Sequence, residues 1–302
     1  MTVDLAAAAD FMAAHARILD RRRFDLLFAD GTPEPVLAAV DGYRNPDGGY
    51  GWGLEPDLRS VTSQPGGALH AFEAFADVVP RAATPRAREL CDWLADVTLP
   101  DGGLPFALPV ADPAACAPFW AAADPSRSSL QITAVVTAEA HRVAAHDPAV
   151  AGHPWLARAT DFCLAAIRDL GREPHAYELA FAVRFLDAAA RTRPEARGLL
   201  DAVRPHLPDD GLLHVAGGAD DEYLRPLDFA PRPGGPGREL FRDDVVDAEL
   251  DRLAAAQQDD GGWAVDFVSY SPAAALEWRG HRTVEALAIL RDNGRLSSLH
   301  RR

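Results

Sequence analysis

The stretch Gln257-Gln258-Asp259-Asp260-Gly261-Gly262-Trp263 decides the fold class of this 302-residue chain. It follows one apolar segment with helical spacing and precedes another. Glycine adopts the left-handed backbone that ends a helix, and an aromatic ring after such a turn packs over it and ties neighbouring helices together. We therefore expect a helix–turn–helix unit here, with Trp263 in a packing role.

The same glycine turn recurs along the chain. Asn45-Pro46-Asp47-Gly48-Gly49-Tyr50-Gly51-Trp52 and Leu99-Pro100-Asp101-Gly102-Gly103-Leu104-Pro105-Phe106 are weaker copies, and Gly171 and Gly211 mark two degenerate ones. The intervals from Gly48 through Gly102, Gly171 and Gly211 to Gly261 are 54, 69, 40 and 50 residues, which suits a helical-hairpin repeat. Alternating strand-like runs are scarce, so the sequence predicts an all-α protein.

Each turn separates two predicted helices, which we expect to form an outer and an inner layer. The predicted outer helices are 33–44, 84–97, 155–170, 194–206 and 243–257. The predicted inner helices are 62–79, 127–146, 174–191, a weakly marked piece at 221–229, and 274–292, with residues 3–19 as a sixth. Residues 20–31 either complete the outer layer as a twelfth helix or lie outside it. Neither end carries a clearly polar capping repeat, so the hairpins are expected to close into a ring within one domain, residues 1–302.

The segment from Gln257 to Trp263 resembles the Q-x-x-x-G-x-W repeat of squalene and hopene cyclases. With the weaker copies, the resemblance to the terpene cyclase and protein prenyltransferase superfamily spans about residues 33–293. It implies a single α/α toroid with about six inner and five to six outer helices around a central cavity. A resemblance of this kind concerns architecture, whereas function must be argued from a site.

Composition excludes several classes of protein. The net charge of -15 and the pI near 5.0 disfavour nucleic acid as a partner, because that binding depends on clustered Lys and Arg. No run of about eighteen apolar residues predicts a membrane span, and the N-terminus lacks the apolar core of a signal peptide. Three cysteines without CxxC spacing favour a reducing cytoplasm. The oligomeric state stays open.

The candidate site residues follow from the repeat. Each glycine turn leads into the N-terminus of an inner helix, so several positive helix ends are expected to converge on one mouth of the cavity. The candidate catalytic residues are Asp57, Asp228, Glu277 and His281. The candidate substrate-binding residues are Trp52, Arg59, Arg127, His175, Tyr223, Tyr270, Trp278 and Arg279. The alternative reading of each acid or hydroxyl is a helix cap, and of each aromatic, core packing.

Metal sites are not strongly indicated, and we predict no cofactor. The string Asp243-Asp244-Val245-Val246-Asp247 matches the D-D-x-x-D pattern that binds magnesium in prenyl diphosphate enzymes. It opens a predicted outer helix, where first-turn acids are favoured by the helix dipole alone, so magnesium stays an alternative. Zinc is disfavoured, because His281-Arg282-Thr283 does not align with the family's Tyr-His-Thr and no Asp-x-Cys lies upstream.

Three functions remain open. The first is an isoprenoid-processing enzyme, cyclase-like or prenyltransferase-like, that handles an apolar small molecule; Glu277 or His281 would move a proton, and Arg59, Arg127 and Arg279 would hold an anion. The second is a carbohydrate-active toroid with paired carboxyls drawn from Glu55, Asp57, Asp228 and Glu277. The third is a non-catalytic binding protein, consistent with the missing Asp-x-Asp-Asp acid motif of cyclases.

Overall fold

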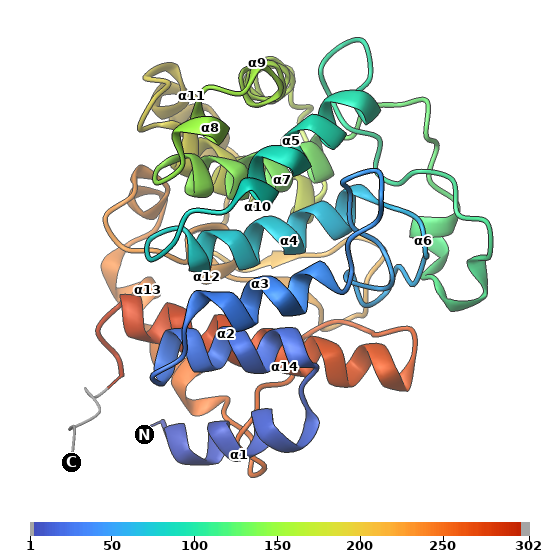
Figure 1. Cartoon of the computed structure of the whole chain (residues 1–302). Helices are drawn as coiled ribbons and strands as arrows, with labels where there is room; N and C mark the ends of the chain where they lie inside the picture. The colour runs from blue at the N-terminus through green and yellow to red at the C-terminus, as the bar shows by residue number, and fades with distance from the viewer. Residues whose placement is uncertain (1–2, 297–302) are drawn as a thin grey trace.

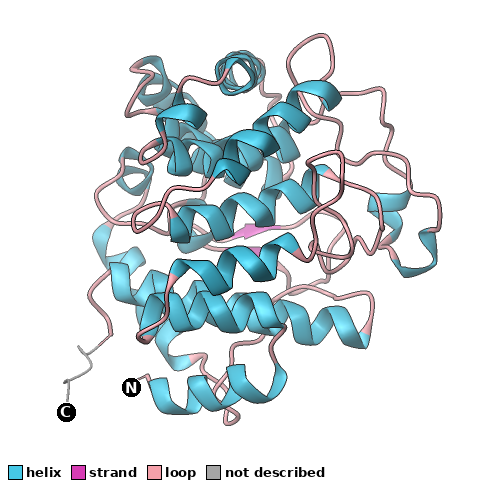
Figure 2. Cartoon of the chain, viewed as in Figure 1, coloured by secondary structure: helices cyan, strands magenta, loops and turns pink. Residues whose placement is uncertain are grey.

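The computed structural model describes residues 3–296, and helices dominate it (Figure 2). The all-α prediction is confirmed for this part of the chain, apart from one antiparallel pair of two-residue strands. In that pair, β1 (Leu213–His214) aligns Leu213 with Leu224 of β2 (Tyr223–Leu224). Within the described range, no helix is both long enough and apolar enough to cross a membrane.

The helices follow one another along the chain in six consecutive pairs, and a glycine turn predicted from the sequence lies between the two helices of every pair except the first. The pairs are α1 (Leu5–His15) with α2 (Ile18–Phe28), α3 (Pro33–Asp41) with α4 (Pro65–Val78), α5 (Pro85–Val97) with α7 (Leu130–Ala144), α9 (Pro154–Arg168) with α10 (Ala176–Ala189), α11 (Glu195–Val203) with α12 (Pro226–Phe229), and α13 (Asp243–Ala255) with α14 (Pro272–Asp292). The connections between these helices contain short elements: α6 (Pro118–Ala121), α8 (Pro148–Ala151) and the 3-10 helices Pro113–Ala115, Arg204–His206 and Pro236–Leu240.

The N-terminal prediction needs correction. Residues 3–19 do not form one helix, because the backbone is extended at Ala16 and Arg17, and α2 begins at Ile18. Arg17 is held in that bend by Asp20 at 2.6 Å and by the Leu54 carbonyl at 2.8 Å. Of the two N-terminal helices, the one that packs against α4 is therefore α2, which also takes up most of residues 20–31.

Helix contacts run in order along the chain and return to its beginning. Helix α4 packs between α2 and α7, α7 packs against α10, and α10 against α12. The last helix, α14, lies against α1, α2 and α13. Figure 1 shows this red helix beside the blue N-terminal ones. The first and last hairpins are therefore direct neighbours.

The turn at Gly261 makes this junction tight. Its φ of +90° is a glycine conformation, and a Cβ there would overlap the Ala7 carbonyl of α1. Trp263 is 1% exposed, and its Nε1 donates to the Leu253 carbonyl at 2.8 Å. Its backbone N–H donates to Thr283 Oγ1 of α14 at 3.0 Å. The packing role predicted for Trp263 is confirmed, since the ring ties α13 to α14.

The close approach at Gly261 predicts a large cost for any side chain there. Gly261→Ala should destabilise the protein by about 1–2 kcal/mol for the left-handed backbone and by a further ~1–3 kcal/mol for the overlap with α1. Gly217→Ala is the matched control, because Gly217 also has positive φ, +83°, but nothing lies within 4 Å of its would-be Cβ. Urea unfolding measures both; equal losses would contradict a close α1 contact.

Candidate functional site

A cavity of about 190 Å³ lies among α4, α7, α10, α12, α14, strand β2 and residues 265–267. Its lining is half apolar and half charged or polar. The apolar and aromatic members are Leu69, Val135, Tyr177, Ala180, Phe181, Tyr223, Leu224, Val265, Phe267 and Trp278. The polar members are His70, Glu73, Arg184, Glu222, Asp228, Asp266, His281, Arg282 and Glu285. Carboxylates outnumber guanidinium groups five to two.

One wall of the cavity carries a buried histidine held between two acids. His70 and Glu73 are three apart on α4 and therefore share a face of that helix. His70 Nδ1 lies 2.8 Å from Glu73 Oε2, and His70 Nε2 lies 2.8 Å from Glu55 Oε2. His70 is 4% exposed, and protein carboxylates rather than water therefore provide the hydrogen-bond partners of both ring nitrogens.

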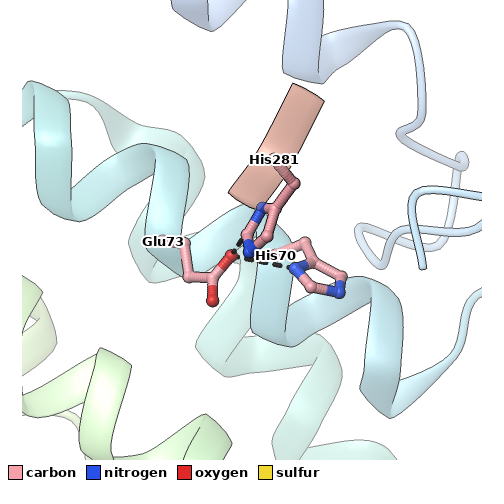
Figure 3. Close-up of side chains that lie close together, drawn as sticks. All are labelled: His70, Glu73 and His281. Atoms are coloured by element: carbon pink, nitrogen blue, oxygen red, sulfur yellow. Dashed lines mark hydrogen bonds and ion pairs between the residues drawn. The ribbon is translucent and has the colours of Figure 1, made fainter. Parts of the chain in front are cut away.

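A second histidine reaches the same wall from α14 (Figure 3). His281 Nδ1 lies 3.8 Å from Glu73 Oε2, and the two imidazole rings meet edge to face at 5.1 Å between centroids. Arg23 Nη1 of α2 lies 3.4 Å from His281 Nδ1. Arginine has no acceptor, so this contact requires an unprotonated Nδ1 on His281.

The pKa values of the two histidines are shifted in opposite directions. Burial on its own lowers the pKa of His70, but the charge of Glu73 and the hydrogen bonds to Glu55 and Glu73 raise it to about 9. Burial lowers the pKa of His281, and the positive charges of His70 and Arg23 add to that effect. The pKa of Glu73 lies well below its usual range, because the neighbouring imidazoles and Arg23 outweigh the effect of burial.

A second wall of the cavity holds two carboxylates, Glu285 and Asp228, near two arginines. Glu285 of α14 lies 2.8 Å from Arg282 Nη1 and 3.8 Å from Arg184 Nη2 of α10. Asp228 of α12 accepts the Arg225 backbone N–H at 2.8 Å, and Arg184 Nε donates to the Asp228 carbonyl at 2.6 Å.

The environments of these two acids separate their pKa values. Burial raises the pKa of Asp228, against the opposing charges of Arg282 and Arg184, and the charge of Glu285 adds to the rise. Burial would also raise the pKa of Glu285, but Arg282 and Arg184 lower it to about 2. Two carboxyls whose pKa values are pushed apart are the arrangement in which one donates a proton and the other stays ionised.

Four of the twelve candidate site residues line the cavity: Asp228, Tyr223, Trp278 and His281. Asp57 is buried beside it and acts through Trp278, whose indole Nε1 donates to Asp57 Oδ2 at 2.7 Å. The Tyr270 backbone N–H donates to the other Asp57 oxygen at 3.0 Å. Burial raises the pKa of Asp57, although these two hydrogen bonds oppose the rise.

The other candidate residues lie outside the cavity lining. Glu277 forms an ion pair with Arg59 at 2.6 Å, and Arg279 pairs with Asp260 at 2.7 Å. His175 accepts the Tyr177 backbone N–H at the start of α10. The remaining three, Trp52, Arg127 and Tyr270, are exposed.

The acids of the D-D-x-x-D string lie on α13, away from the cavity lining. Asp244 pairs with Arg242 at 2.9 Å, and Asp247 with Arg295 at 2.7 Å. In residues 3–296, the cluster of three or more His, Cys, Asp or Glu side chains close enough to share a metal ion is His70, Glu73 and His281.

Three residues of the cavity lining were not predicted from the sequence: His70, Glu73 and Arg184. Each lies mid-helix, whereas most of the candidate residues lie in or shortly after the glycine turns. A signal was present, because His70 and Glu73 interrupt the otherwise apolar face of residues 65–78 at a spacing of three. Polar side chains on the buried face of a helix require partners, and such partners concentrate at sites.

No protein-family model matches this chain, and no curated protein matches its sequence.

The ion pair of Glu285 predicts a stability change in acid. Its pKa of about 2 lies below the ordinary 4.5, so its contribution is complete above pH 4.5 and is lost as the pH falls toward 2. The full shift corresponds to roughly 3 kcal/mol. Glu285→Gln should therefore be clearly less stable than the wild type at pH 6, with the gap narrowing by pH 3 in urea unfolding. A gap that stays constant across this range would contradict the ion pair.

Proposed function

We propose that the chain is an α/α toroid of the type found in the terpene cyclase and prenyltransferase superfamily. The support is the order of helix contacts, in which α2, α4, α7, α10 and α12 follow one another and α14 returns to α2. The glycine turns support it too, because each packs against the first helix of the next pair. Gly48 lies against α5, Gly102 against α9, and Gly261 against α1. Closure of α14 on α1 replaces the capping that an open repeat array needs.

We further propose that the protein is an enzyme that works by acid catalysis in the cavity. The carrying observation is the pair Asp228 and Glu285, which lie near the same two arginines and have pKa values displaced in opposite directions. Asp228 is the proton donor, since burial keeps its protonated form accessible at a higher pH. Glu285 stays ionised and stabilises positive charge that develops in the substrate.

The substrate is an uncharged and partly apolar small molecule, for which an isoprenoid alkene is the first candidate. Five aromatic rings line the cavity, and their faces stabilise the carbocation that forms when Asp228 protonates a double bond. The cation then returns a proton to the Asp228 carboxylate, which gives a cyclised or isomerised alkene and restores the acid. The excess of carboxylates over arginines disfavours a diphosphate, because an anion placed there would be repelled. The volume of about 190 Å³ favours a short chain over a long polyene.

A sugar is the second candidate, and the paired carboxylates favour it. Glycoside cleavage requires one acid that protonates the leaving oxygen and a second, ionised carboxylate on the other side of the bond. Asp228 and Glu285 suit these two roles, and Trp278 provides a surface on which a sugar ring stacks. The two candidates share the acid and differ in the bond that it protonates.

The acid predicts a specific loss of turnover. Asp228→Asn should lower kcat by about 100-fold or more, because an amide cannot donate the proton that the carboxyl supplies. The amide oxygen still accepts the Arg225 N–H, so folding should be retained. Wild-type activity should fall as the pH rises through the pKa of Asp228. Turnover is measured by chromatography coupled to mass spectrometry, which separates isomers of equal mass, with short prenyl alcohols in one series and aryl glycosides in the other.

Asp221→Asn is the matched control, because Asp221 is exposed, and it should keep wild-type kcat. Product from the prenyl alcohols alone supports the first candidate, and product from the glycosides alone supports the second. A folded Asp228→Asn protein with unchanged turnover would remove Asp228 as the donor. No conversion in either series would sink both substrate classes.

A further inference from the structure

We propose that His70, Glu73 and His281 form a binding site for one divalent transition-metal ion, with zinc as the reference ion. This site goes beyond the acid catalysis proposed above and does not depend on it. Each residue offers one ligand atom, and the three atoms lie within 4.8 Å of one another (Figure 3). Two imidazoles and a carboxylate are a ligand set that binds zinc and, in other proteins, iron(II).

The spacing of the ligand atoms is close to what a metal requires. Bonds of about 2.0–2.2 Å in a tetrahedron place the ligand atoms ~3.4 Å apart. His70 Nδ1 lies 2.8 Å from Glu73 Oε2, and His281 Nδ1 lies 3.8 Å from that oxygen. One distance is slightly short and the other slightly long, so small side-chain rotations bring both to the required value. His70 and Glu73 start from fixed positions, because one helix turn of α4 carries both.

The outer contacts of His70 are those of a metal ligand. Its Nε2 donates to Glu55 Oε2 at 2.8 Å, which leaves Nδ1 directed at the cluster. Metal-bound histidines almost always donate their second N–H to a carboxylate or carbonyl, and this contact fixes the tautomer and the ring orientation. Glu55 is itself held, because its Oε1 accepts the Asp57 backbone N–H at 3.1 Å.

Trp278 holds both rings in place from the cavity side. Its ring lies edge to face with His70 and with His281, at 5.6 Å between centroids in each pair. The indole is fixed in turn by its hydrogen bond to Asp57. The imidazoles therefore reach the cluster with little rotational freedom left to lose, and such preorganisation favours binding.

The side chains around the cluster carry more negative than positive charge, which favours a bound cation. Four buried or nearly buried carboxylates stand in this network, and two arginines oppose them: Asp20, Glu55, Glu73 and Asp77 against Arg17 and Arg23. When His70 is neutral, as a metal ligand must be, the excess of two negative charges equals the charge of a divalent ion. Arg23 approaches His281 Nδ1 but also donates to Asp77 at 2.8 Å, so it keeps a partner when His281 turns to a metal.

The open side of the cluster faces the cavity. His70, Glu73 and His281 all belong to the cavity lining, and they supply three protein ligands. A closed structural zinc site has four protein ligands, whereas a catalytic one has three and leaves a position for water or substrate. The geometry therefore points to an ion whose open coordination position faces the cavity, where water or substrate can bind it.

Metal content tests the proposal without any substrate. Untagged full-length protein, stripped with a chelator and dialysed against zinc, should bind one equivalent, measured by elemental analysis and calorimetry. His70→Gln and His281→Gln should each weaken binding by at least ~100-fold, and Glu55→Gln by ~10–100-fold, because it removes the negative charge of the carboxylate that accepts the His70 N–H. His175→Gln is the control, since His175 is exposed and lies outside the cluster, and it should bind as the wild type does.

Two results would overturn the site: no stoichiometric binding of zinc, cobalt, manganese or iron(II) to the stripped wild type, or unchanged zinc affinity in both histidine variants. If those variants fail to fold, X-ray absorption at the zinc edge of the wild type decides instead. Nitrogen and oxygen ligation with imidazole scattering supports the site, and sulfur ligation contradicts it. Failure here leaves the Asp228 test unaffected, because that test concerns another wall of the cavity.

Discussion

The buried charge network that joins α2, α4 and α14 is the constraint on which the site depends. Arg23 contributes from α2, Glu73 and Asp77 from α4, and His281 from α14. Moving a charged group from water into the protein interior costs several kcal/mol of desolvation free energy, and only well-placed partners of opposite charge offset that cost. A shift of any one of these helices would leave a charge without its partner. The network therefore fixes the relative positions of three helices that are far apart in the sequence.

Helix α14 carries that constraint into the chemistry of the cavity. Gly280 lets it approach the bend after α1, because a Cβ there would lie 2.9 Å from Ala16 Cβ. The next residue, His281, enters the histidine wall, and Glu285 one turn later enters the carboxylate wall. A single helix thus sets the distance between the two groups of reactive side chains, and the close fit at Gly280 sets the register of that helix.

The sequence predicted the fold better than the site, and the reason is physical. Glycine turns with the aromatic at Trp263 depend on local backbone geometry, which short-range patterns report well. The break at Ala16 depends on contacts of Arg17 with Asp20 and with the distant Leu54 carbonyl, so the pattern of residues 3–19 missed it. Sequence patterns for sites favour the ends of helices and strands. His70 and Arg184 lie mid-helix, so they can be recognised as site residues only from the packing of the helices against one another.

The two walls of the cavity favour different chemistries, and charge decides between them. Glu285, which stays ionised, stabilises a substrate that becomes positive after protonation by Asp228. A divalent ion at His70 and His281 would oppose such a cation across a small, poorly screened space, and would instead polarise an oxygen of the substrate or a water. Carbocation chemistry therefore requires that no metal ion is bound at His70 and His281, whereas cleavage of a bond to oxygen is compatible with a bound metal ion. The occupancy of that site consequently bears on the substrate class as directly as any turnover assay.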